Sequence, residues 1–235
     1  PPGPGPGGPP QQQQQQQAHQ PPGAPSPVAQ YAMAALAGRS VEAKLLLPNA
    51  KVGVVIGKGG AVINHIRETS KATLDIAEPG GGPPQSGAAA ERVVSFAGDF
   101  GAVYLAFQMV LQHLTNAQSN ALDQMGQPPV LEAVVLVPRN KTGGLIGRSG
   151  SSINRVRSDS GATVKVGAPE DLVPSEPDAR KCVVSGTIDQ VMRAFALVVH
   201  KLEETPAGAA RAPDPSLIGG GPHAGGPHGA GGHPQ

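Results

Sequence analysis

The chain has 235 residues, of which 33 are glycine and 26 are proline; neither favours helix or strand interiors, which excludes a single 235-residue globule. One cysteine excludes a disulfide framework, and no apolar run reaches the roughly 18 residues of a membrane-spanning helix. The formal net charge of +1 hides a segregation of charge, since residues 139–157 carry five cations and no acid, and residues 170–178 four acids and no base. We expect a soluble intracellular protein, nuclear or cytoplasmic, that does not contact membranes.

The N-terminal 38 residues are rich in proline, glycine and glutamine and include seven consecutive glutamines, Gln11 to Gln17. Such a composition buries too little apolar surface to offset the entropy of ordering, so residues 1–38 are expected to be a disordered tail. The glutamine tract could still support self-association, as an alternative to a solvated tail.

A first compact domain is expected over residues 39–117. Apolar residues alternate over 41–47 until a proline, which predicts a strand, and the following apolar stretch 52–56 leads to a glycine loop and a helix over 61–70. Residues 72–77 and 91–97 are strand-like, and an apolar stripe from 103 to 114 predicts a long closing helix. The predicted order is βααββα, a three-stranded antiparallel sheet covered by three helices.

The same pattern recurs in a second domain, expected over residues 130–205. Residues 41–76 and 131–166 align without a gap at 15 identities in 36 positions, which indicates an internal duplication. Residues 118–129, which contain Gly126, Pro128 and Pro129, are interpreted as a flexible linker that spans roughly 20 Å and lets both domains engage one strand. Residues 206–235 form a Gly/Pro/His-rich tail, whose histidines have no tetrahedral spacing, so we expect no metal and no cofactor.

Each domain has one short glycine loop directly before its second helix. The loops are Gly57-Lys58-Gly59-Gly60 and Gly147-Arg148-Ser149-Gly150. Glycine permits close backbone approach, and a helix N-terminus offers unpaired N–H groups and a partial positive charge, so each loop is expected to hold a phosphate beside its cation.

Three enzyme motifs with similar parts do not fit these loops. A Walker loop would need one more residue between its two glycines, and it would also need Ser or Thr directly after Lys58. A dinucleotide-binding fingerprint would need glycine in place of Val62. A nucleophile elbow around Ser149 would need glycine at Ser151. No catalytic constellation recurs in both copies, so the chain is not expected to be an enzyme.

The two segments V-I-G-K-G-G-x-x-I and L-I-G-R-S-G-x-x-I resemble the signature of the type I KH domain, and the sequence resembles in particular the poly(C)-binding and Nova-like group. The resemblance covers both compact domains and implies an α+β fold whose loops clamp about four nucleotides of single-stranded nucleic acid over an aliphatic groove. The residues expected to contact RNA are Gly53, Val54, Ile56, Gly57, Lys58, Gly59, Gly60, Ile63, Arg67, Leu74, Ile76 and Arg92, and in the second copy Gly143, Gly144, Ile146, Gly147, Arg148, Ser149, Gly150, Ile153, Arg157, Val164, Lys165, Val166 and Arg180.

Arginines occupy two matching positions in the copies, Arg67 with Arg157 and Arg92 with Arg180. The resemblance implies that they help to read cytosine, whose acceptors suit a side chain that carries donors only. Asp75 stands where that group carries a neutral or basic residue, and Lys165 takes this place in the second copy, so the second domain is expected to bind better.

The predicted function is selective binding of single-stranded, C- or pyrimidine-rich RNA in post-transcriptional regulation of mRNA, with single-stranded DNA as an alternative ligand. Association with the same or another protein is possible through the closing helices or the glutamine tract. The alternative function is a protein-interaction scaffold with a vestigial groove, and an accessory domain of an enzyme would need a catalytic partner outside this chain.

Overall fold

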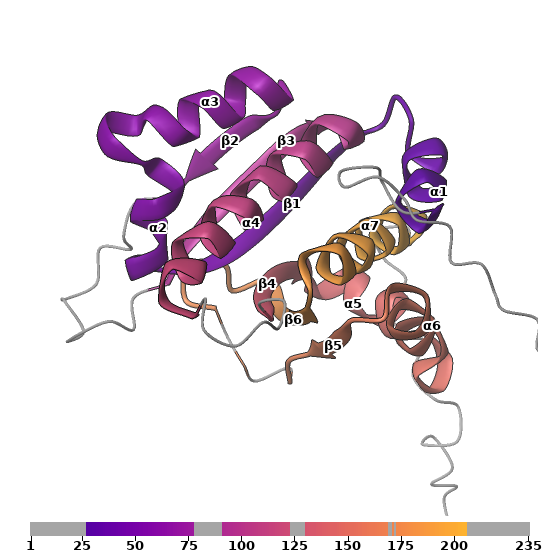
Figure 1. Cartoon of the computed structure of the whole chain (residues 1–235). Helices are drawn as coiled ribbons and strands as arrows, with labels where there is room; N and C mark the ends of the chain where they lie inside the picture. The colour runs from indigo at the N-terminus through magenta and orange to yellow at the C-terminus, as the bar shows by residue number, and fades with distance from the viewer. Residues whose placement is uncertain (1–26, 78–90, 123–129, 169–170, 172, 206–235) are drawn as a thin grey trace, which may run out of the picture.

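The computed structural model describes residues 27–77, 91–122, 130–168, 171 and 173–205. Both repeats have the order βααββα, so the expected α+β fold is confirmed (Figure 1). The first repeat consists of β1 (Ser40–Pro48), α2 (Asn49–Ile56), η1 (Lys58–Gly60), α3 (Ala61–Ser70), β2 (Thr73–Ile76), β3 (Glu91–Asp99) and α4 (Phe100–Leu122). The second consists of β4 (Leu131–Pro138), α5 (Arg139–Ile146), η2 (Arg148–Gly150), α6 (Ser151–Ser160), β5 (Thr163–Val166), β6 (Ala179–Gly186) and α7 (Ile188–Glu204).

The two three-stranded sheets are joined into one antiparallel sheet of six strands, in the order β2-β3-β1-β4-β6-β5. At the seam, Leu45 of β1 faces Val135 of β4, and these two residues are equivalent in the sequence repeat. An approximate two-fold axis therefore passes through this pair, perpendicular to the sheet. The β1–β4 ladder has three residue pairs. Two residues beyond the end of this ladder, the same register would place Pro138 opposite Glu42, and proline has no N–H to donate.

The closing helices α4 and α7 lie next to each other on one face of the sheet (Figure 1). The rings of Phe107 and Phe195, again equivalent in the repeat, stack with centroids 3.8 Å apart and planes 6° from parallel. Residues of both units thus share one apolar core. This contact lies within one chain, so association between chains through these helices stays a prediction.

A further helix precedes the first repeat, α1 (Pro27–Ala35), and it packs on α7 of the second unit. Ala32 and Leu36 are buried, and the ring of Tyr31 lies 5.4 Å from that of His200. The expectation of disorder up to residue 38 is therefore wrong from Pro27 onward, because the apolar residues after the proline-rich stretch have a surface to bury against.

Other expected boundaries also shift or lie outside the described residues. Helix α4 continues to Leu122, into the segment interpreted as a linker. Residues 1–26, 123–129 and 206–235, with the glutamine tract and the C-terminal histidines, lie outside the described residues. Within the described part, none of the helices is long and apolar enough to cross a membrane.

Candidate nucleic-acid interface

Each glycine loop is a bend, and the backbone structure explains why its first residue is glycine. Gly57 and Gly147 have φ values of 72° and 74°. A Cβ atom on Gly57 would lie 2.9 Å from the main-chain nitrogen of Val62, and one on Gly147 would lie 2.8 Å from that of Ser152. Glycine at these two positions is therefore required both by conformation and by the close approach of the following helix.

The inner positions of the loops are open to solvent. Lys58 and Arg148 are exposed, and a Cβ atom on Gly59 would meet no atom within 4 Å. Ser149 adopts the same left-handed conformation as Gly59, with φ of 50° and 61° respectively, so a side chain is tolerated there. The tip of each loop is thus free to meet a ligand.

The loops lead directly into α3 and α6, and no side chain caps the N-terminus of either helix. The first N–H groups and the positive end of the helix dipole therefore face the same region as Lys58 or Arg148. This combination favours an anion such as a phosphate group.

The apolar residues beside the loops divide into exposed and core positions. Val54, Ile56 and Ile76 are half-buried and offer side chains to a ligand, as do Ile146 and Val166 in the second unit. Ile63 and Ile153 are nearly buried.

Two of the apolar residues that were expected to contact RNA belong to the core instead. Leu74 and Val164 are at most 1 % exposed, so their side chains do not form part of a groove floor. Gly53 and Gly143 are exposed and lie one turn before the loops. Gly144, in contrast, lies close to Thr205, which follows α7: a Cβ atom on Gly144 would be 2.9 Å from the Cβ atom of Thr205.

Arg67 and Arg157 connect the second helix of each unit to its outermost strand. The Nε of Arg67 donates to the carbonyl oxygen of Leu74 at 2.9 Å, and that of Arg157 donates to Val164 O at 2.8 Å. Arg157 Nη1 also donates to Asn154 Oδ1 at 2.7 Å. A guanidinium carries five N–H donors, more than these bonds use, so each is held in place with donors left for a ligand.

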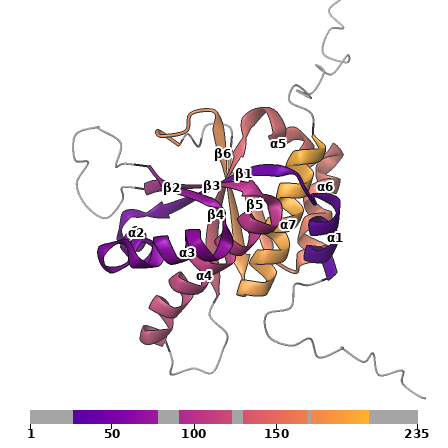
Figure 2. The same cartoon turned by 90° about the horizontal axis from the view of Figure 1, so that it is seen from above.

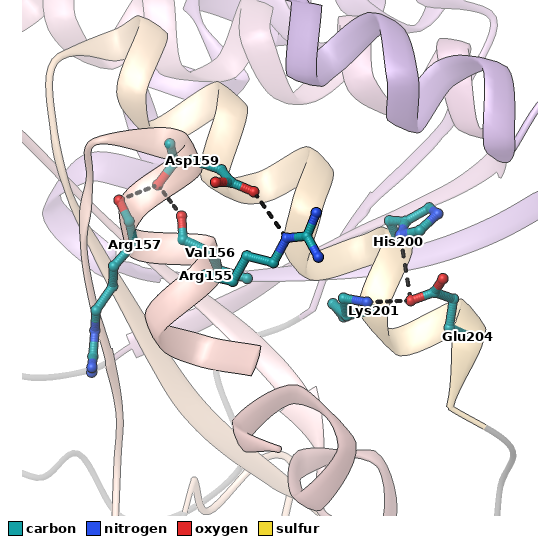
Figure 3. Close-up of polar contacts among 8 residues, drawn as sticks. Arg155, Val156, Arg157, Asp159, His200, Lys201 and Glu204 are labelled. Carbon is teal, nitrogen blue, oxygen red and sulfur yellow. Dashed lines mark hydrogen bonds and ion pairs between the residues drawn. The ribbon is translucent and has the colours of Figure 1, made fainter. Parts of the chain in front are cut away.

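Arg157 is distinguished from its neighbour on the same helix by direction. Arg155 turns to Asp159, at 3.3 Å, while the side chain of Arg157 extends away from that pair (Figure 3). Of these two arginines, Arg157 therefore contacts the edge strand β5, whereas Arg155 pairs along its own helix.

The arginines at the start of the third strand of each unit converge on the same edge. Arg92 Nε donates to Ala77 O at 2.8 Å, and Arg180 Nε donates to Gly167 O at 3.0 Å. These acceptors directly follow Ile76 and Val166 on β2 and β5. In each unit, two arginines thus bracket one short edge strand.

The backbone of this edge strand also offers hydrogen-bonding groups. Ala77 N donates to Val93 O, and Gly167 N donates to Lys181 O. Because hydrogen bonding alternates along an antiparallel pair, the N–H and C=O groups of the preceding residues, Ile76 and Val166, point away from the sheet. Donor and acceptor groups therefore line the edge where a base could lie.

Asp75 and Lys165 are placed differently from the prediction. Both are exposed residues that alternate with buried Leu74 and Val164, so they lie on the sheet face opposite the helices. Asp75 therefore does not share the face of the helices, which removes the reason given for weaker binding by the first unit. The predicted RNA contact at Lys165 has no support from its position.

The two candidate grooves lie beside β2 and β5, at opposite ends of the six-stranded sheet (Figure 1); Figure 2 views the molecule from the β2 end. Five strand spacings separate these strands, roughly 24 Å. The β1–β4 seam and the α4–α7 contact fix this separation, so it is not set by a flexible linker as expected.

Comparison with known proteins agrees with this architecture. Residues 42–112 and 132–200 each match the family model of the KH domain, and the chain therefore belongs to the KH-domain family. KH domains are nucleic-acid-binding modules whose G-x-x-G loop holds the backbone of single strands.

Several solved structures match at low identity and low TM-score. The a/eIF2alpha–aDim2p–rRNA complex from Pyrococcus horikoshii OT3 matches at 19 % identity over 74 % of this chain and 91 % of that chain, with a TM-score of 0.25. Dim2p from the same organism matches at 18 % identity over 72 % and 95 %, also at 0.25. A protein of unknown function from Aeropyrum pernix matches at 12 % identity over 69 % and 84 %, at 0.26.

Proposed function

We propose that this protein binds single-stranded, C- or pyrimidine-rich RNA through both KH units and regulates mRNA after transcription by binding, without catalysis. The observation that supports it is the repeated constellation of an exposed cationic loop tip, an uncapped helix N-terminus and an edge strand bracketed by two arginines. A phosphate at the loop and a base at the edge strand would satisfy both sets of groups.

The preference for cytosine rests on the resemblance to the poly(C)-binding and Nova-like group and on donor chemistry. Arginine donates only, which suits the O2 and N3 acceptors of cytosine. An outward-facing backbone carbonyl on β2 or β5 can accept from the cytosine amino group. Half-buried aliphatic side chains, such as Ile56 and Ile146, would support the base face.

The test is a titration of the full chain with a C-rich single-stranded RNA oligomer, followed by fluorescence anisotropy. Replacing Lys58-Gly59 and Arg148-Ser149 by Asp-Asp pairs should abolish binding and leave the fold intact, because these positions are exposed and an aspartate tolerates left-handed backbone better than most residues. The same sequence as DNA and as duplex RNA distinguishes the ligand classes.

Two matched charge-reversal variants distinguish an effect of the loop sites from an effect of the net charge. The double variant Lys58→Asp/Arg148→Asp should lose binding, whereas Arg39→Asp/Lys71→Asp, which reverses two exposed cations away from the loops, should lose little. Unchanged affinity in the four-substitution variant would favour the protein-interaction scaffold.

A further inference from the structure

The sheet face opposite the helices carries a second, smaller apolar cluster at the seam between the units. Leu46 and Val93 come from the first unit, and Leu136 and Ala179 come from the second. Val173, from the segment that connects β5 to β6, completes the cluster and is only 1 % exposed. The second unit's connecting segment is therefore packed partly on the first unit.

Two ion pairs cross the seam on the same side. Lys44 Nζ of β1 lies 2.8 Å from Glu176 Oε1 of the connecting segment, and Lys181 Nζ of β6 lies 2.7 Å from Glu91 Oε2 of β3. All four side chains are partly exposed. Hydrogen bonding to Glu176 raises the pKa of Lys44, because the carboxylate favours the charged ammonium.

The two ion pairs are not repeated at the positions related by the internal duplication. In the repeat, Lys44 corresponds to Val134, and Glu91 corresponds to Ala179. At these two positions the second unit therefore has no charged side chain that could form the equivalent ion pair with the first unit. The first unit holds a segment of the second through contacts that the pseudo-symmetry does not duplicate.

The same segment is tied to the candidate groove of the second unit. It begins at Gly167, whose carbonyl oxygen accepts from Arg180 and whose N–H donates to Lys181 O at 2.7 Å. Ala168 N donates to Asp171 Oδ2 at 2.9 Å, and Arg139 N donates to Asp178 O at 2.8 Å. A shift of the segment would therefore move the acceptor that orients Arg180.

We propose that Lys44 and Glu91 of the first unit are positioning residues for the RNA groove of the second unit. This inference rests on the proposed function. Lys44 holds the β5–β6 segment directly through Glu176, and Glu91 holds Lys181 on β6, whose carbonyl oxygen accepts from Gly167 N at the start of that segment. Together these contacts keep Arg180 directed to the edge strand. They also keep the carboxylates of Asp171, Glu176 and Asp178 away from the RNA phosphates.

The test uses the full chain in a background where only the second groove can bind, Lys58→Asp/Gly59→Asp. There Lys44→Glu should weaken binding of a C-rich oligomer about fivefold, at the upper end for a partly exposed ion pair. It should also reduce the preference for C-rich over U-rich oligomers. Lys44→Arg should retain both properties, and Lys44→Glu/Glu176→Lys should restore them.

The mirror background, Arg148→Asp/Ser149→Asp, reports the first groove alone, and there Lys44→Glu should change nothing. Equal losses in both backgrounds would indicate a general charge effect and overturn the inference, as would unchanged binding in the first background. A second pair, Glu91→Lys with Lys181→Glu, provides the same test if a Lys44 variant fails to fold. If the unsubstituted chain does not bind the oligomer at all, the proposed function itself fails.

Discussion

At the scale of single residues, the glycine loops separate residues that shape the backbone from residues that meet a ligand. Gly57 and Gly147 are fixed by close approach to the next helix, whereas Lys58 and Arg148 and the residues that follow them, Gly59 and Ser149, are exposed. The arginines have a double role, because each holds an edge strand and still has donors to offer.

Base preference should depend on Arg157 and not on its neighbour Arg155. We expect Arg157→Ala to reduce discrimination between C-rich and U-rich oligomers by about tenfold, the order of one lost base contact. Arg155→Ala should leave it unchanged, since Arg155 pairs with Asp159. Lys58→Ala should weaken binding to all sequences alike, because a phosphate contact carries no sequence information.

Competition titrations against C-, U- and A-rich oligomers measure both quantities. The assignment would be reversed if Lys58→Ala altered the base preference and Arg157→Ala lowered all affinities equally.

At the residue scale, the positions of the loops and of the four arginines beside the edge strands could be predicted from the sequence, because spacing and repetition identify them. Their contact with RNA stays a prediction. The burial of Leu74 and Val164 could not be predicted, since a strand of four residues does not show which apolar side chains face the core and which face a ligand. Strand alternation was the available signal for Asp75 and Lys165, which occupy the positions between buried residues.

At the scale of elements, helix α7 has a complete N-terminal cap. The Thr187 hydroxyl accepts from the backbone of Gln190, and the Gln190 side chain accepts from the backbone of Thr187. Since α7 contacts α1, α4, α5 and α6, its start helps to hold the whole helical layer.

Removing this cap should lower stability without touching the candidate grooves. Thr187→Ala should reduce the free energy of unfolding by about 1 kcal/mol, and Thr187→Ser should retain most of it because serine is also a good N-cap. Urea unfolding of the full chain measures the difference. An equal loss for both variants would mean that the threonine methyl group, and not the cap, is responsible.

The periodicity of apolar residues predicted the order of strands and helices in both repeats, but it did not predict α1. Residues 28–37 contain five alanines together with Tyr31, Met33 and Leu36, a helix-favouring composition that the neighbouring proline-rich stretch obscured. The helix also needs α7 to pack against, and that surface belongs to the other repeat, about 170 residues away along the chain.

At the scale of the whole molecule, the units form one body. One sequence signal for the seam was present: Leu45, Leu46 and Leu47 are consecutive and all buried, which is typical of a strand covered on both faces. The pairing of β1 with β4 itself is not encoded in any local pattern, because it depends on two surfaces that meet only after both units fold.

The two-fold relation reverses the direction of the second groove relative to the first. A strand bound in both must therefore turn back and cross roughly 24 Å of sheet. We expect an oligomer with two C-rich tracts joined by a long unstructured spacer to bind at least tenfold more tightly than one tract, and the gain to disappear when the spacer is shortened to a few nucleotides.

Anisotropy titrations across a series of spacer lengths test this geometry. A gain that is independent of spacer length would contradict the fixed arrangement of the grooves.

An NMR titration of the isotope-labelled full chain with a C-rich single-stranded RNA tests directly whether the two glycine loops bind RNA. The amide signals of Gly57 to Gly60, Gly147 to Gly150, Ile76 and Val166 are expected to shift most. Signals at the seam, around Leu45 and Val135, should stay in place. Shifts confined to the α4–α7 surface or to the seam, with the two glycine loops unchanged, would contradict RNA binding by the loops.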